Sequence, residues 1–373
     1  LQAYREGRRE HEKETAALLK LYRQSEDYRE LAEEMTEAAF AGYSHSPLSE
    51  QVAREIYGTM LQNSISRLER YAACAYSHFL QYGLQLRERE EYSFEPADLG
   101  NIYHMVLERF AGKLAEHGKT WFNFDEKEAD AWLKEALLES TTSYGETILY
   151  SNARYEYMTE RILRILRRTV RTLKTQLLGG AFVPSHFEMS FQRVEDLDAV
   201  NIALSEHEKM KLKGRIDRID TFEDEEHVYV KVIDYKSGNK KFDLAALYYG
   251  LQLQLVVYMN VAVEMEKRRN PGKEVVPAAL LYYHVADPLV KEEKELSPEE
   301  INDRMLKELR TTGIVSAEEP VVSLLDRTLS GKSLLIPVER KKDGSFSASS
   351  SVVSKEDYEV ISGYVNEKIR QFG

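Results

Sequence analysis

The sequence predicts an α/β fold, in which a central sheet is flanked by helices and preceded by an additional helical region. Residues 185–236 contain apolar runs typical of strands, two of them joined by an acidic turn at residues 223–226. Residues 243–269 have the apolar spacing of one long helix, and a further strand follows near residues 277–285. Residues 1–60 are rich in charge and are predicted to be helical.

We expect the chain to have two parts. Residues 1–60 contain no chemical motif, whereas residues 61–373 hold the α/β domain. Within that domain the large apolar residues Trp121 and Trp132 are expected to anchor the core. The domain is predicted to end in a helix that Ser354 caps.

Two short segments, residues 214–220 and 232–238, place two carboxylates and a lysine on adjacent predicted strands. Asp234 and Lys236 are two residues apart, so on a strand their side chains leave the same face. The turn between the strands brings Asp217 close to both. Carboxylate oxygens are suitable ligands for Mg²⁺ or Mn²⁺. A neighbouring lysine can orient a water molecule or stabilise charge on a phosphate.

The same residues also have a simpler interpretation, because Asp and Lys in this spacing are common as a solvated ion pair. Two features favour a functional site. Asp234 follows Val232 and Ile233, so its face is expected to be buried, where charges persist when paired or metal-bound. Ser237 and Gly238 then end the strand and place Lys236 at the mouth of the site.

Two predicted helices carry further candidate residues. One is expected to begin at Asp98, which would cap it. Gly100 and His104 lie one turn apart on its surface, so the small residue leaves room for a group to approach the imidazole. Gln254 and Tyr258 have the same spacing in the later helix. Each pair taken alone is more typical of an ordinary helix face.

In this order the segments resemble the RecB-type branch of the PD-(D/E)XK nucleases. The resemblance implies the restriction-endonuclease-like fold, with a mixed central sheet, and metal-dependent hydrolysis of DNA. The family pattern is Gly…His, an acidic residue in a strand, Gly-x-x-Asp-Arg-x-Asp, Asp-Tyr-Lys-Ser-Gly and Gln-x-x-x-Tyr. In this chain these elements are Gly100 and His104, Glu188, residues 214–220, residues 234–238, and Gln254 with Tyr258.

The resemblance implies a ligand set for Mg²⁺ or Mn²⁺. Its members would be the side chains of His104, Asp217 and Asp234 and the backbone carbonyl of Tyr235. The two aspartates would also count as catalytic residues of the nuclease.

The resemblance also assigns the remaining motif residues. Lys236 would be the catalytic lysine and Glu188 a further catalytic acid. Gln254 and Tyr258 would line the DNA channel, where the tyrosine would stack on a base of single-stranded DNA.

Residues 63–84 give a closer match. The run from Ser64 to Cys74, with Ser66-Arg67-Leu68-Glu69 at its centre, is similar to the segment before the nuclease domain in AddB subunits of bacterial AddAB helicase–nucleases. Ala75-Tyr76 replaces the usual Pro-Phe of that family. The resemblance covers roughly residues 50–370 and implies an AddA-type helicase–nuclease subunit as partner. It also implies a role in double-strand-break repair by recombination, with residues 1–60 derived from the helicase-like region.

Cys74 is the single cysteine of the sequence. In AddB subunits one cysteine at this place and three near the C-terminus bind a 4Fe–4S cluster. Because such a cluster requires four thiolates, we expect it in a full-length parent and not in this chain. Without the resemblance, Cys74 would be expected to be a buried, inert thiol.

The composition limits the class of protein. A formal net charge of −12 and a pI near 5.4 are unfavourable for a stand-alone DNA binder. The five arginines of residues 161–171 can form a local phosphate track or a solvated helix face, and both interpretations stay open. The chain begins with Leu1 and has neither a signal peptide nor a long apolar run, so we expect a fragment of a cytoplasmic protein without membrane contact.

Two alternative functions remain. The domain could be a non-catalytic DNA-binding or scaffold domain that kept the fold. The presence of Asp217, Asp234 and Lys236 argues against this alternative. It could also be a different RecB-like exonuclease, such as a CRISPR-associated one. Residues 66–69 and the long helical insertion before Glu188 favour AddB.

Overall fold

The computed structural model describes residues 11–40, 47–87, 96–143, 153–191, 197–205, 207–289 and 297–373. The chain divides into two compact units, Leu1–Ile56 and Tyr57–Gly373. The first contains the helices α2 (Glu12–Gln24) and α3 (Arg29–Phe40), and α4 (Glu50–Tyr57) ends at its boundary. Of these helices only α3 buries a residue, Ala32, so the described part of this unit has almost no core of its own.

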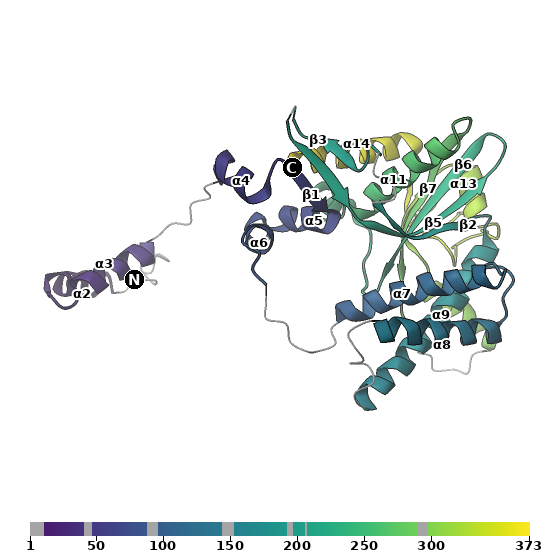
Figure 1. The fold of residues 1–373 in the computed structure, drawn as a ribbon, viewed down its shortest axis with the longest axis horizontal. Coiled ribbons are helices and arrows are strands. Elements are labelled where there is room, and N and C mark those ends of the chain that lie inside the picture. The colour runs from purple at the N-terminus through teal and green to yellow at the C-terminus, as the bar shows by residue number, and fades with distance from the viewer. Residues whose placement is uncertain are drawn as a thin grey trace. The chain divides into compact units, whose positions relative to one another are not determined.

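The second unit is built on a mixed sheet of six strands in the order β2-β5-β6-β7-β8-β9 (Figure 1). The bounds are β2 (Val183–Ser190), β5 (Arg215–Glu223), β6 (His227–Lys236), β7 (Glu274–His284), β8 (Thr312–Ser316) and β9 (Val352–Val353). The β2/β5, β5/β6 and β7/β8 pairs are antiparallel, whereas β6/β7 and β8/β9 are parallel. The predicted α/β fold with a mixed central sheet is therefore confirmed.

Helices cover both faces of this sheet (Figure 1). One face carries α7 (Pro96–Glu116), α8 (Glu126–Ser143) and α9 (Ala153–Gly179), and the other carries α11 (Gln254–Arg269) and α14 (Lys355–Phe372). Alternation along β6 sends Ile233 into the core under the first set and Val232 into the core under the second. Trp121 and Trp132 are buried in the first core, as predicted. Ser354 caps α14, also as predicted.

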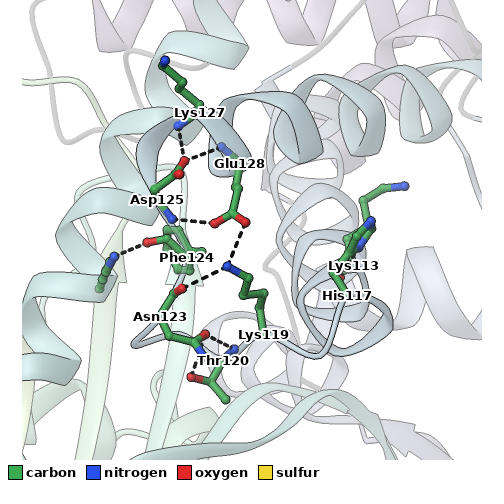
Figure 2. Close-up of polar contacts among 10 residues, drawn as sticks. Lys113, His117, Lys119, Thr120, Asn123, Phe124, Asp125, Lys127 and Glu128 are labelled. Atoms are coloured by element: carbon green, nitrogen blue, oxygen red, sulfur yellow. Dashed lines mark hydrogen bonds and ion pairs between the residues drawn. The ribbon is translucent and has the colours of Figure 1, made fainter.

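The connection between α7 and α8 is held by a small polar network (Figure 2). Asp125 caps α8 by accepting hydrogen bonds from the backbone of Lys127 and Glu128, each at 2.8 Å. Glu128 completes the box by accepting from the backbone nitrogen of Asp125 at 2.8 Å, and its other oxygen pairs with Lys119. The turn is thereby fixed where α8 begins to pack on α7.

A second, three-stranded sheet has the order β1-β4-β3, with bounds β1 (Met60–Ser64), β4 (Lys209–Lys213) and β3 (Asn201–Ala203). Strand β1 leads directly into α5 (Ile65–Ala73), whose first turn Ser64 caps by accepting from the backbone of Arg67. A short helix α6 (Ala75–His78) and a π-helical turn η1 (Phe79–Gly83) follow.

Two helix boundaries differ from the sequence prediction. Helix α7 begins at Pro96 and contains Asp98 in its first turn, because proline is well suited to the first helical position. The helix expected over residues 243–269 is broken into α10 (Leu244–Tyr248) and α11. Gly250 adopts a φ of 78° at the break, a conformation that ends a helix. Gln254 is therefore the first residue of α11.

The remaining helices are α12 (Pro298–Glu308) and α13 (Glu319–Leu325). In the described part of the chain, no helix combines the length and apolar character needed to cross a membrane.

Candidate active site

The hairpin of β5 and β6 brings two carboxylates together. Its antiparallel register pairs Arg218 with Ile233, which places Asp217 opposite Asp234. Both aspartates are buried, at 6% and 1% exposure respectively. The backbone nitrogen of Tyr235 donates a hydrogen bond to Asp217 Oδ2 at 2.7 Å, so this carboxylate is held in a fixed orientation.

Strand β2 adds a third carboxylate. Phe187 pairs with Arg218 and Met189 with Ile216, so Glu188 lies opposite Asp217 on the other side of β5. Glu188 is 7% exposed and has a φ of 46°, in the left-handed region that non-glycine residues rarely adopt. Such strained residues concentrate at functional sites. The backbone of β2 is thus distorted at the residue that faces the aspartates.

Helix α7 supplies the imidazole of His104. Its Nδ1 lies 3.0 Å from Glu188 Oε1 and 3.3 Å from Asp217 Oδ1. Burial alone would lower the pKa of His104, but hydrogen bonds and charges from Asp217 and Glu188 outweigh it and raise the pKa to about 10. Without a bound cation the imidazolium therefore partly neutralises the two carboxylates.

These residues fit a hard divalent cation. His104, Glu188 and Asp217 each offer a ligand atom, and the three atoms lie within 4.8 Å of one another. Glu188 Oε2 and both oxygens of Asp234 are buried and accept no hydrogen bond, although each carboxylate has a cationic neighbour. Buried carboxylate oxygens without donors favour a cation, and oxygen with imidazole donors suits Mg²⁺ or Mn²⁺.

The compact group of three contains Glu188 in place of Asp234, which belonged to the predicted ligand set. Asp234 lies beside this group. Burial and the neighbouring Asp217 raise the pKa of Asp234 to about 7, against the opposing effect of Lys236.

Lys236 lies at the end of β6 and joins the carboxylates to α11. Its ammonium group forms an ion pair with Asp234 and donates a hydrogen bond to Gln254 Oε1 at 3.0 Å. Gln254 in turn donates from Nε2 to the hydroxyl of Tyr258 at 2.8 Å. The structure thus joins the predicted lysine, glutamine and tyrosine in one hydrogen-bonded chain.

Tyr258 is 5% exposed, and its ring packs edge-on against Phe191 with centroids 5.8 Å apart. The predicted stacking of this ring on a base therefore finds no exposed ring face in this structure.

Comparison with known protein families decides the identity of this arrangement. The model of the PD-(D/E)XK nuclease superfamily matches residues 62–338, which include every residue of the site described above. The chain belongs to this superfamily. The predicted resemblance to PD-(D/E)XK nucleases is confirmed.

Curated relatives narrow the family further. The chain is 39% identical over 334 residues to the AddB subunit of the ATP-dependent helicase/deoxyribonuclease of Lachnoclostridium phytofermentans, covering 87% of this chain and 28% of that relative. Relatives of the same name are 37% identical in Clostridium novyi and 34% identical in Bacillus mycoides, covering 28% and 30% of those proteins and 86% and 94% of this chain. The predicted similarity to AddB subunits is confirmed, and the chain spans less than a third of these relatives.

One site residue of this PD-(D/E)XK chain was not predicted. Arg215 Nε lies 2.5 Å from Glu188 Oε2 and partly balances the carboxylate charge. Its side chain is 54% exposed, so solvent weakens this pair. The signal was present in the sequence, because Arg215 and Asp217 share one face of the same strand.

Cys74 lies between α5 and α6 and is exposed, contrary to the expectation of a buried thiol. Its sulfur accepts a hydrogen bond from the backbone of Ser77 at 3.4 Å, as the cap of α6. A residue that must cap a helix at the surface cannot also be packed in the core. The end of α14 lies nearby, because Phe372 packs on Tyr71 of α5 with centroids 5.6 Å apart.

Proposed function

We propose that this chain is a metal-dependent deoxyribonuclease domain that hydrolyses phosphodiester bonds of single-stranded DNA as an exonuclease. One observation carries the proposal: in a PD-(D/E)XK chain, His104, Glu188 and Asp217 converge beside the Asp234–Lys236 pair. A scaffold domain has no need to keep these buried carboxylates, whose mutual repulsion is unfavourable for folding.

Each residue has a role in this proposal. His104, Glu188, Asp217 and Asp234 would hold Mg²⁺ or Mn²⁺, with the carbonyl of Tyr235 as a further ligand. When bound, such a cation lowers the pKa of water and offsets charge on a phosphate.

Lys236 acts on the nucleophile or the phosphate, because its ammonium group reaches the open end of the strand and is 23% exposed. Gln254 holds the lysine, and Gln254 and Tyr258 line the entry of the DNA strand. The ammonium group and Gln254 are in place before substrate binds, which reduces the reorganisation needed during the reaction.

The test uses the purified chain and end-labelled single-stranded DNA, with Mg²⁺, Mn²⁺ or a chelator. We expect cleavage only with a metal, and loss of cleavage in Asp217→Ala and Asp234→Ala with the fold retained. Asp224→Ala is the matched control, because this exposed aspartate lies at the other end of the same hairpin. Cleavage at the parent rate in either site variant would refute the assigned site. Metal-independent binding without cleavage would instead support the non-catalytic alternative.

We further propose that the domain works within a helicase–nuclease that repairs double-strand breaks by recombination, with an AddA-type subunit as partner. The names and identities of the relatives support this proposal. In the same scheme residues 1–60 belong to the helicase-like region of the parent subunit.

The 4Fe–4S cluster of the AddB resemblance does not fit this chain alone, because Cys74 is its single thiol. We propose that a parent with three further cysteines after α14 binds the cluster. The packing of α14 on α5 supports this arrangement. An extended parent reconstituted with iron and sulfide should be brown, and Cys74→Ser should bleach it. A colourless parent would contradict the assignment.

A further inference from the structure

Glu69 links a helix outside the proposed active site to the first turn of α11. It lies on α5, and one of its carboxylate oxygens accepts hydrogen bonds from the backbone nitrogens of Leu253 at 2.8 Å and Gln254 at 3.2 Å. The first amides of a helix have no acceptor within the helix and need one from elsewhere. Leu253, the N-cap of α11, has an apolar side chain that cannot supply it. Glu69 therefore caps α11 from a distant part of the chain.

The residue that Glu69 holds by its backbone is the residue that holds the lysine by its side chain. Gln254 Oε1 accepts from Lys236 Nζ at 3.0 Å, while Nε2 donates to Tyr258. A shift of the Gln254 backbone would move the acceptor of Lys236. The bonds run in one line from Glu69 through Gln254 to Lys236 and end at Asp234.

A second carboxylate, on α11 itself, provides a comparison. Glu264 accepts hydrogen bonds from the backbone nitrogens of Asp198 and Ala199, each at 2.9 Å, so it makes the same number of backbone bonds as Glu69. Its other bond goes to Arg268, on the side of α11 away from Gln254 in sequence. If backbone capping alone mattered, removal of either carboxylate should have the same consequences for the protein.

We propose that Glu69 is a positioning residue for Lys236, acting through the first turn of α11 and the carboxamide of Gln254. The proposal rests on the proposed nuclease function and adds to it a residue outside the metal ligands and the lysine. It also gives the segment from Ser64 to Glu69 a task at the active site. Its first serine caps α5, and its glutamate fixes α11.

The kinetic test compares Glu69→Ala, Glu69→Asp, Glu69→Gln and the control Glu264→Ala, with single-stranded DNA and Mn²⁺. We expect Glu69→Ala and Glu69→Asp to lower kcat at least tenfold with KM and Mn²⁺ affinity within twofold of the parent. The aspartate is one methylene too short to reach the amides and remains informative if the alanine variant does not fold. Glu69→Gln should restore most of kcat, because its amide oxygen can accept the same two bonds. Glu264→Ala should keep the parent kcat.

A double variant tests the route. Because Glu69 acts through Gln254, adding Glu69→Ala to Gln254→Ala should lower kcat by less than twofold. Multiplicative losses in the double variant would overturn the proposal, as would a kcat for both Glu69→Ala and Glu69→Asp equal to that of Glu264→Ala.

A spectroscopic measurement separates this inference from the nuclease function itself. The side-chain amide signal of Gln254, identified by its loss in Gln254→Ala, should move in Glu69→Ala and Glu69→Asp, return in Glu69→Gln and stay in place in Glu264→Ala. Absence of metal-dependent cleavage by the parent chain would sink the proposed function. An unmoved Gln254 signal in the Glu69 variants would sink the positioning role, whether or not the parent cleaves DNA.

Discussion

At the scale of single residues, the carboxylate of Asp234 lies between a second buried carboxylate and a lysine. Its pKa is raised from 3.8 to about 7, first by burial and then by Asp217. The folded protein therefore keeps a proton that the unfolded chain releases above about pH 4. Since the folded state binds more protons in this interval, the metal-free protein loses stability as pH rises from 4 to 7.

Asp234→Asn should remove this loss. In chelator, the free energy of unfolding of the variant relative to the parent should rise by about 2–3 kcal/mol between pH 5 and pH 8, and then level off. Urea denaturation followed by the fluorescence of Trp121 and Trp132 measures it. Asp224→Asn is the control of opposite sign, because backbone hydrogen bonds from His227 and Glu226 lower the pKa of Asp224. An Asp234→Asn variant that gains no stability with pH would contradict the burial of an ionisable carboxylate here.

Lys236 differs from the aspartates because its role is in the reaction and not in holding the metal. Lys236→Ala should lower kcat about 100-fold or more, while Mn²⁺ binding measured by calorimetry stays close to the parent. Lys134→Ala, on the exposed surface of α8, is the control. Loss of Mn²⁺ affinity as large as that of Asp217→Ala would argue against a separate catalytic role.

At the scale of elements, the parts of the fold that the sequence predicted are local. The β5–β6 hairpin follows from alternation and one acidic turn, and the register then places Asp217 opposite Asp234. The β1-β4-β3 sheet was not predicted, because β1 and β4 pair in parallel from distant parts of the chain and give no local signal. The left-handed backbone of Glu188 also has no sequence signature, since that conformation is imposed by its neighbours in β2 and β5.

The break before α11 shows the same limit. The apolar spacing of residues 243–269 continues through the break, so a single helix was the reasonable prediction. The deciding contact is tertiary: at Gly250 a side chain would collide with Phe372 of α14, and the helix restarts under the carboxylate of Glu69. The pair Gln254 and Tyr258 was predicted, whereas its attachment to Lys236 required the three-dimensional structure.

Helix α7 makes a testable element of the site. At Gly100, one turn before His104, an added Cβ would meet only Ser237 Oγ, at an ordinary 3.4 Å. Gly100→Ala should therefore raise the free energy of unfolding by about 0.5–1 kcal/mol and keep cleavage near the parent rate. Gly100→Leu should extend toward Ser237, next to Lys236, and lower cleavage at least tenfold.

Gly112→Leu is the control for this substitution, because a Cβ at that position of the same helix meets nothing within 4 Å. Both leucine variants gain helix propensity, so thermal denaturation should find neither less stable than the parent. Equal cleavage by the two leucine variants would show that α7 leaves more room at the site than its contact with Ser237 indicates.

At the scale of the whole molecule, the question is how a chain of net charge −12 binds DNA. Four arginines of α9 form ion pairs with acidic residues of other segments: Arg164 and Arg168 with Asp287, Arg167 with Asp130, and Arg171 with Glu126. These contacts favour the interpretation of residues 161–171 as an ion-paired helix face. Closer to the site, Lys236 and Lys240 both lie within 6 Å of the ring of Tyr282.

Salt dependence of DNA binding distinguishes the two surfaces. The affinity of the cleavage-deficient Asp217→Asn variant for a labelled single-stranded oligonucleotide is measured by anisotropy in Mg²⁺ at increasing salt. If about three cations near the site neutralise phosphates, the slope of log K against log salt should be about −2. Lys240→Gln should make it less steep by about 0.7, whereas the double variant Arg164→Gln/Arg168→Gln should leave it unchanged because those arginines already have acidic partners. The reverse result would place the phosphates along α9 and restore the basic-track interpretation of that helix.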